Sequence, residues 1–214
     1  MLQRLSPRVE LLLINLICFG PFAAMSVRGM IRRDTVILYD DRYLFTTLAI
    51  ELVAGTIAAL ILRARGWTLS DLGLRVTMPL TIAGMLLFIG ANVTVAGLYE
   101  GFRAVTGTDP GAATQTVARA SWLATLLILL IDPLYEETFE VAYNIRAAEG
   151  DGPAFAVTLS AAVRLVCNLH QGPIAPLTIL PLGIIFAAVY WKWRRVWPLT
   201  VAHGAATYFT LAPQ

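Results

Sequence analysis

Long apolar runs recur along this chain and constrain its fold more than any other feature. At 1.5 Å per residue, helices of about 17–27 residues cross most or all of a hydrocarbon core that is roughly 30 Å thick. The apolar segments are 9–27, 44–63, 77–98, 121–147, 153–170, 174–193 and 196–212. Backbone groups that face lipid must be paired within their own segment, and the short alternating strands of a barrel are absent, so these segments are predicted to be helices.

The composition agrees with a membrane protein and argues against other classes. Hydrophobic residues make up 57% of the chain and charged residues 14%, against about 25% charged in a soluble domain. A net charge of +2 is too small to indicate a nucleic-acid partner. We therefore predict an all-α, polytopic transmembrane bundle of seven spans, with residues 1–214 as a single integral-membrane domain in a lipid bilayer. The stretches 28–43 and 99–120 leave room for an eighth, interfacial helix.

Four carboxylates fall within nine residues of the apolar segment 121–147. They are Asp132, Glu136, Glu137 and Glu140. On a regular helix, Asp132, Glu136 and Glu140 share one face, while Glu137 lies about 100° around the axis. An ionisable side chain inside a span costs roughly 2.5–3.5 kcal/mol on insertion scales, which favours a functional role. The alternative is that the span ends before the glutamates, which are then solvated among the lipid headgroups.

The two histidines of the chain, His170 and His203, lie near the ends of two other apolar segments. Glu and His are the usual general bases, although either histidine alone is equally compatible with a structural place in the core. Thr207 follows His203 by one helical turn, and the stretch from Asn168 to Pro173 predicts a turn that holds His170. Arg164 is the only permanently charged cation of its segment, and we expect one of the four carboxylates to be its partner.

Three sequence blocks resemble the CAAX-protease and bacteriocin-processing (CPBP, or Abi) family of glutamic-type intramembrane endopeptidases. Glu136-Glu137 is similar to the paired glutamates of the family's EExxxR motif. The stretch 164–173 resembles the block around the FxxxH histidine, and 196–203 resembles the block that begins the HxxxN/D motif. The resemblance implies a helical membrane protease with a catalytic core at about 121–212.

The resemblance also implies roles for individual residues. Glu136 would be the base that activates water, Glu137 its supporting carboxylate, His170 the second partner of the water and His203 the donor to the oxyanion. Glu140 and Asn168 are expected to support them.

This sequence departs from the family pattern at three places: Val141 stands where the family has arginine, Val166 where it has phenylalanine, and Thr207 where it has asparagine or aspartate. We hypothesise that Arg164 supplies the missing positive charge.

These observations predict an intramembrane endopeptidase that hydrolyses a peptide bond of a membrane-anchored protein or peptide with Glu/His-activated water. No cofactor is expected from the resemblance, although Glu136, His170 and His203 leave open a zinc site with three ligands. The alternatives are a non-catalytic peptide-binding or immunity protein, and a proton-coupled carrier that uses Glu10 or Glu51. The absence of a long sorting region favours a prokaryotic cytoplasmic membrane.

Overall fold

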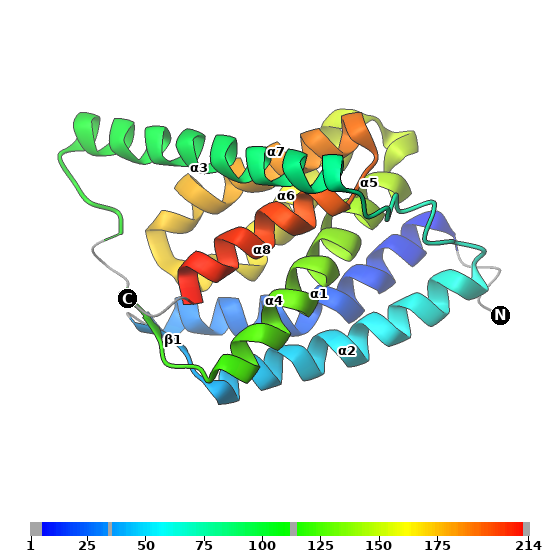
Figure 1. Ribbon diagram of the computed structural model, residues 1–214, viewed down its shortest axis with the longest axis horizontal. Helices are drawn as coiled ribbons and strands as arrows, with labels where there is room; N and C mark the ends of the chain where they lie inside the picture. The colour runs from blue at the N-terminus through cyan, green and yellow to red at the C-terminus, as the bar shows by residue number, and fades with distance from the viewer. Residues whose placement is uncertain (1–5, 34–35, 112–114, 212–214) are drawn as a thin grey trace.

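The computed structural model describes residues 6–33, 36–111 and 115–211 and contains a bundle of α-helices (Figure 1). The α-helices are α1 (Pro7–Arg32), α2 (Asp41–Ala64), α3 (Met78–Thr106), α4 (Trp122–Glu136), α5 (Asn144–Ala147), α6 (Pro153–Cys167), α7 (Ala175–Trp193) and α8 (Trp197–Leu211). A π-helical segment, Glu137–Tyr143, joins α4 to α5, and short 3-10 turns occupy Glu149–Asp151 and Leu169–Ile174. The strands are β1 (Val36–Tyr39) and β2 (Gln115–Ala118).

The helices agree closely with the predicted apolar segments. α4, the π-helical segment and α5 follow one another without a break over 122–147, where a single segment was predicted. Helices α1, α2, α3 and the stretch Leu169–Trp193 are each long and apolar enough to cross a membrane, and α6 is a shorter apolar helix. The all-α membrane architecture is therefore supported, while the count of seven spans stays a prediction. Residue 212, the end of the last predicted segment, lies outside the described residues.

Two connections between helices differ from the prediction. In their described parts, 28–43 and 99–120 hold no separate interfacial helix, because α1 and α3 extend into them. These connections instead contribute β1 and β2, which pair in parallel with Val36 opposite Gln115 and Tyr39 opposite Ala118. Sequence patterns miss this two-stranded sheet because four residues are too few to establish an alternating pattern, and the pairing joins distant parts of the chain.

Polar side chains fix where several helices begin. The residue before each of α1, α2, α3 and α4 accepts a hydrogen bond from the backbone N–H three positions later, which satisfies one of the unpaired donors of the first turn. These residues are Ser6, Asp40, Thr77 and Ser121. At the other end of α3, Gly107 adopts φ 67°, a left-handed conformation that glycine takes without strain. The boundaries of the apolar segments are thus encoded locally.

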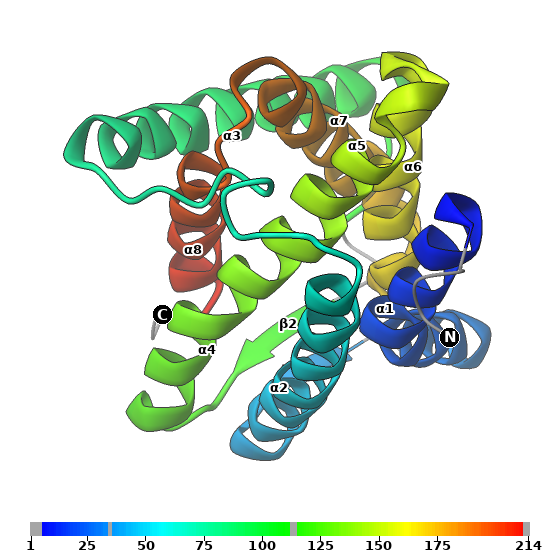
Figure 2. The same ribbon diagram turned by 90° about the vertical axis from the view of Figure 1, so that its right-hand side faces the viewer.

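Helix α4 runs through the middle of the bundle, with α2 on one side and α8 on the other (Figure 2). α3 packs along α8, and α6 packs along α7. Small residues allow these close approaches. A Cβ atom at Gly84 of α3 would lie 2.6 Å from Cβ of Val201 on α8, and one at Gly183 of α7 would lie 3.2 Å from Cα of Ala161 on α6. The acidic residues of α4 are consequently surrounded by other helices.

Candidate active site

The acidic residues lie where the central helix changes its geometry. α4 contains Pro133, which has no backbone N–H to donate, and ends at Glu136, where the π-helical segment begins. A π-helical turn is wider than an α-helical one and is frequently found at functional sites. The single acidic face expected on a regular helix therefore divides. Asp132 and Glu136 line a cavity, whereas Glu137 and Glu140 both contact Arg164.

Arg164 is the cation at the centre of this acidic cluster, as the sequence predicted. Its side chain extends from α6, and the residue is only 3% exposed. Nη2 lies 2.6 Å from Oε1 of Glu137, Nε lies 2.5 Å from Oε1 of Glu140, and Nη1 lies 3.9 Å from Oε2 of Glu136. A buried carboxylate is costly unless a charge of opposite sign compensates it. Arg164 thus provides that compensation for three carboxylates from a neighbouring helix.

His203, on α8, is held by the same cluster. Its Nδ1 lies 2.9 Å from Oε1 of Glu137 and 3.8 Å from Oε2 of Glu136, and its Nε2 lies 3.8 Å from Oδ2 of Asp132. Because the ionised Glu137 can only accept, we assign a proton to Nδ1 of His203. Glu137 is completely buried and contacts both Arg164 and His203. Glu137 is therefore a positioning residue, which fixes the imidazole of His203 and the guanidinium of Arg164.

A cavity of about 240 Å³ brings the predicted site residues together. Among the residues that line it are Asp132, Glu136, Asn168, His170, His203 and Thr207. The side chain of Glu136 is 25% exposed, against 0% for Glu137 and 1% for Glu140. Of the three glutamates around Arg164, Glu136 is therefore the one whose carboxylate is open to a water molecule in the cavity.

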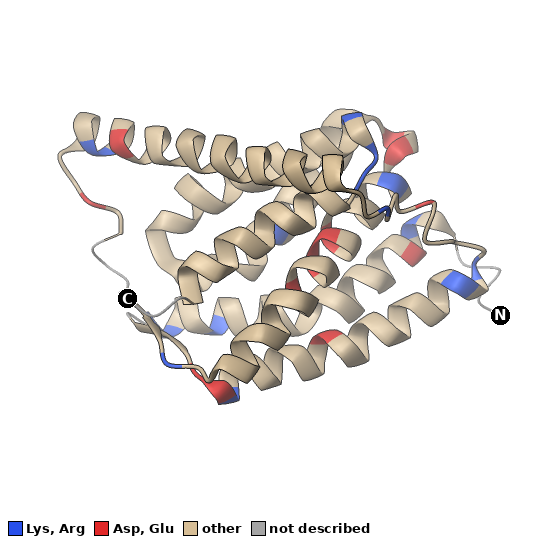
Figure 3. Cartoon of the chain, viewed as in Figure 1, with Lys and Arg blue, Asp and Glu red and all other residues tan. Residues whose placement is uncertain are grey.

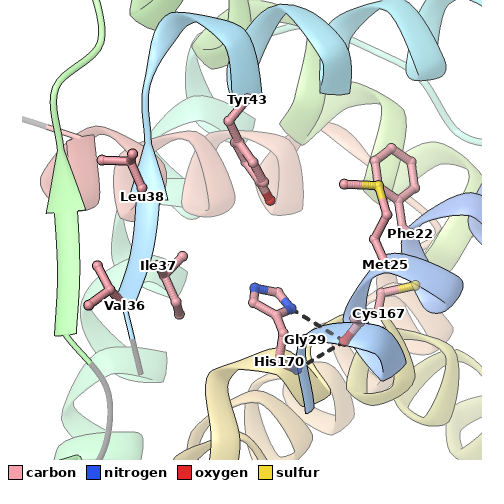
Figure 4. A pocket seen from close by; sticks show the side chains of 10 residues that line it. Phe22, Met25, Gly29, Val36, Ile37, Leu38, Tyr43, Cys167 and His170 are labelled. Carbon is pink, nitrogen blue, oxygen red and sulfur yellow. Dashed lines mark hydrogen bonds between the residues drawn. The ribbon is translucent and has the colours of Figure 1, made fainter. Parts of the chain in front are cut away.

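His170 reaches the cavity from the 3-10 turn after α6, the kind of turn that the sequence predicted. Its backbone N–H donates to Oγ of Ser26 at 3.0 Å, and its ring Nδ1 lies 3.3 Å from the same oxygen (Figure 4). Asn168 donates to the carbonyl of Arg164 at 2.9 Å and accepts from Gln171 at 2.8 Å, so it stabilises the end of α6. The sequence analysis missed Ser26, because a serine within a long apolar run carries no distinguishing pattern.

Two further polar residues near the acidic cluster lie outside the three sequence blocks that resemble the CPBP family. Glu51, on α2, is 1% exposed and lies near enough to Asp132 for the two side chains to interact electrostatically. Tyr43, near the start of the same helix, lines the cavity. The sequence considered Glu51 only for a carrier, because α2 shows no motif that would connect it with the acids of α4. Only the packing of α2 against α4 brings them together.

The three zinc ligands considered from the sequence, Glu136, His170 and His203, are not gathered into one group among the described residues. Within 6–33, 36–111 and 115–211, no group of three His, Cys, Asp or Glu side chains is arranged to hold a metal ion. Glu136 and His203 are near each other, but His170 is bound to Ser26 on another helix. The arrangement instead brings together a carboxylate that can accept a proton, an imidazole that can donate one and a cavity with room for water.

Comparisons with known proteins support the resemblance found in the sequence. Residues 118–209 match the family model described as type II CAAX prenyl endopeptidase Rce1-like. A search of curated proteins and a search of solved structures found no significant match. The matched segment includes every element from α4 to most of α8, and so it contains the glutamates, Arg164 and both histidines.

Proposed function

We propose that this protein, whose residues 118–209 match the Rce1-like CAAX prenyl endopeptidase family model, hydrolyses a peptide bond of a membrane-anchored peptide with water activated by Glu136. The observation that carries this proposal is the position of Glu136. Its carboxylate belongs to the Arg164 cluster but remains open to the cavity that His170 and His203 also line. A general base must lie within reach of the water that it deprotonates, and this carboxylate has the required access.

In the proposed reaction, Glu136 removes a proton from water while the water oxygen attacks the carbonyl carbon of the scissile peptide bond. His203 keeps its Nδ1–H on Glu137, is also protonated at Nε2, and donates from Nε2 to the oxyanion that forms. Thr207, one turn further along α8, would orient this end of the substrate. When the C–N bond breaks, Glu136 returns its proton to the leaving amine nitrogen. The products are a carboxylic acid and an amine, which ionise to a carboxylate and an ammonium group. His170 would hold the attacking water from the opposite side of the cavity.

Arg164 takes over the charge of the arginine that the family motif has at the position of Val141. Val141 is completely buried among apolar side chains, while the guanidinium of Arg164 lies 2.6 Å from Glu137 and 2.5 Å from Glu140. A guanidinium offers several N–H groups in one plane, which suits a site with carboxylates on two sides. In this proposal Arg164 keeps Glu137 ionised, and Glu137 in turn orients His203.

The test compares two chemically identical substitutions in detergent-purified protein. The substrate is a fluorogenic, farnesylated peptide that ends in a Cys-a-a-X sequence. Glu136→Gln should lower the rate of cleavage by at least about 100-fold, the usual contribution of a general base. Glu100→Gln, on the exposed side of α3 where Glu100 contacts Arg103, should leave the rate unchanged. Equal rates for both variants would exclude Glu136 as the base.

The same assay separates hydrolysis from the non-catalytic alternative. If the wild-type protein binds the peptide and mass spectrometry finds no cleaved product, the endopeptidase proposal fails and a peptide-binding protein remains. If Glu136→Gln still binds the peptide while the product disappears, the chemistry belongs to Glu136 and the cavity binds independently of it.

A further inference from the structure

The two-stranded sheet has an edge that faces a cavity. The carbonyl of Tyr39 accepts a hydrogen bond from the N–H of Arg119 at 2.9 Å, just beyond β2. In a parallel pair, the residues of one strand direct both backbone groups alternately toward the partner strand and away from it. Tyr39 and Ile37 therefore face β2, and the N–H and C=O of Leu38 point to the opposite edge. No strand pairs with that edge in the part of the chain that the structure describes.

The free edge of β1 lies opposite His170. A cavity of about 190 Å³ is lined by β1 on one side and by the His170 ring with Phe22 and Met25 on the other. Figure 4 shows β1 between β2 and the imidazole, with the side chain of Ile37 directed toward the ring. We call this space the edge cavity. It shares Phe22 and His170, together with Tyr43 and Cys167, with the candidate active-site cavity, so the two cavities are adjacent.

The position of the sheet makes an unpaired edge costly unless something binds there. β1 connects α1 to α2 and β2 precedes α4, at the same end of the bundle (Figure 1). Both connections follow apolar helices, so the sheet lies where those helices leave the hydrocarbon. Irregular backbone at this depth requires water or protein as a hydrogen-bonding partner. An extended peptide supplies such partners in the spacing that a strand edge offers.

We propose that the free edge of β1 binds an extended segment of the peptide substrate as an added strand, through the backbone N–H and C=O of Leu38. The inference rests on the proposed endopeptidase function, because the added strand would lead from the edge cavity to Glu136. The recognised chemistry is the peptide backbone, with apolar side chains accommodated beside Ile37 and Met25. A prenyl or acyl chain alone would fill the same apolar space but would use no backbone group of Leu38.

The test removes one backbone donor without removing the strand. Leu38→Pro deletes the N–H that points to the free edge, and proline is tolerated where the lost N–H does not pair within the sheet. Leu38→Ala is the matched control, because it shortens the side chain and keeps the N–H. Both substitutions are made in the Glu136→Gln protein so that peptide is bound and not consumed. The probe is a fluorescein-labelled farnesylated heptapeptide, and binding is measured by fluorescence anisotropy in detergent micelles.

The expected result is a loss of affinity of about five- to tenfold for Leu38→Pro, the range for one net hydrogen bond. Leu38→Ala should bind within about twofold of the parent. An N-methyl scan of the peptide should find one position whose methylation weakens binding to the parent and adds little in Leu38→Pro, because both changes remove the same contact. Thermal unfolding of both variants should match the parent, which shows that the β1–β2 pairing persists.

Three other outcomes would contradict one of the two proposals, and each can be told from the others. Equal affinities for Leu38→Pro and Leu38→Ala, or a flat N-methyl scan, would overturn the strand-addition proposal. If farnesyl-cysteine methyl ester, which has no peptide bond, loses as much affinity as the heptapeptide in Leu38→Pro, the edge cavity binds the lipid and the proposal fails. Absence of cleavage by the protein with Glu136 intact would instead refute the endopeptidase function while leaving a Leu38-dependent peptide site in place.

Discussion

Two buried charged clusters lie along the same central helix and differ in how completely their atoms are paired. At the end near α5, Glu10 of α1 contacts Nε of Arg65 at 2.5 Å, Nε1 of Trp67 at 3.1 Å and the hydroxyl of Tyr143 at 3.3 Å. On the central helix, one or two turns before Tyr143, Glu136, Glu137 and Glu140 surround Arg164 and His203. Figure 3 shows acidic residues on the middle turns of α2 and α4, whereas the acidic residue of α1 lies in the first turn of that helix.

The difference indicates which cluster is structural and which is functional. Both Glu10 oxygens have donors, whereas Oε2 of Glu137 and Oε2 of Glu140 have no hydrogen-bond partner among the described residues. Buried polar groups are normally satisfied, and a catalytic role is one of the explanations for an exception. The Glu10 cluster therefore joins α1 to the segments that contain Arg65, Trp67 and Tyr143. In the Arg164 cluster, Glu136 is the glutamate whose carboxylate opens onto a cavity.

The largest expected effect comes from Arg164→Met, which leaves several buried carboxylates without a cation. Breaking a buried pair of this kind costs about 3–5 kcal/mol, and the loss of cleavage should equal that of His170→Ala. Thermal unfolding and the peptide-cleavage rate measure the two effects. The double variant Arg164→Met/Glu140→Gln removes one of the surplus charges, so it should regain part of the stability and none of the activity. A cleavage rate near wild type in either variant would end the assigned role of Arg164.

Glu10→Gln should destabilise the protein without lowering the cleavage rate of the folded molecule. It removes the charge that pairs with Arg65, whose side chain is 16% exposed, so the expected loss is about 2–3 kcal/mol of unfolding free energy after allowance for solvent. The catalytic constant of the folded protein should not change. Unfolding in detergent and the cleavage rate below the transition are the measurements. An inactive but fully stable Glu10→Gln protein would contradict the division into two clusters and favour the carrier.

A smaller effect is expected at Gly183, where α7 approaches the Arg164 cluster. A Cβ atom there would lie 3.3 Å from Cδ of Arg164 and 3.2 Å from Cα of Ala161. Gly183→Ala should therefore shift the guanidinium by a few tenths of an ångström and lower the cleavage rate by roughly tenfold, since small misplacements in an active site can reduce rates strongly. Gly20→Ala, in α1 with no atom within 4 Å of the added Cβ, is the control and should keep full activity. Equal cleavage rates for Gly183→Ala and Gly20→Ala would show that the reaction tolerates a displacement of the Arg164 guanidinium.

The smallest effect concerns the loop that supports the Glu10 cluster. Outside the helices, the side chain and the backbone N–H of Thr68 donate to Asp71 at 2.6 and 2.7 Å, and these hydrogen bonds hold the pKa of Asp71 below its usual range. A lowered folded pKa stabilises the protein above the unfolded value of about 4, and this contribution is lost as the pH falls through the folded value. Asp71→Asn should therefore lower Tm slightly at pH 7 and not at pH near 2. A Tm difference that is independent of pH would exclude this contribution.

Much of the fold followed from local patterns. The apolar segments predicted α1 to α8 closely, because each helix that faces lipid must have a length of apolar sequence that matches the membrane. The turn that presents His170 was also predicted, since Asn168 and the Gly-Pro pair act within a few residues. The sheet of β1 and β2 was not, because its two short strands gain their stability only from each other.

The candidate site was predictable in its members and less so in its arrangement. Four acids in an apolar segment and two histidines at segment ends already indicated chemistry, and Arg164 was matched to the acids because an unpaired buried charge is costly. The expected face of Asp132, Glu136 and Glu140 divided, since the π-helical segment changes the number of residues per turn. Ser26 was missed because its contact with His170 comes from the packing of a distant helix.

The sequence by itself determined the membrane helices, the acidic composition of the central one and the need for a cation beside it. These follow from the transfer free energies of side chains, which depend on residue type and spacing alone. Only the tertiary structure decided that Glu136 faces a cavity while Glu137 and Glu140 face Arg164, and that Leu38 presents a free strand edge across from His170. Those outcomes depend on how helices pack and where the backbone departs from regular geometry, which are properties of the whole assembled bundle.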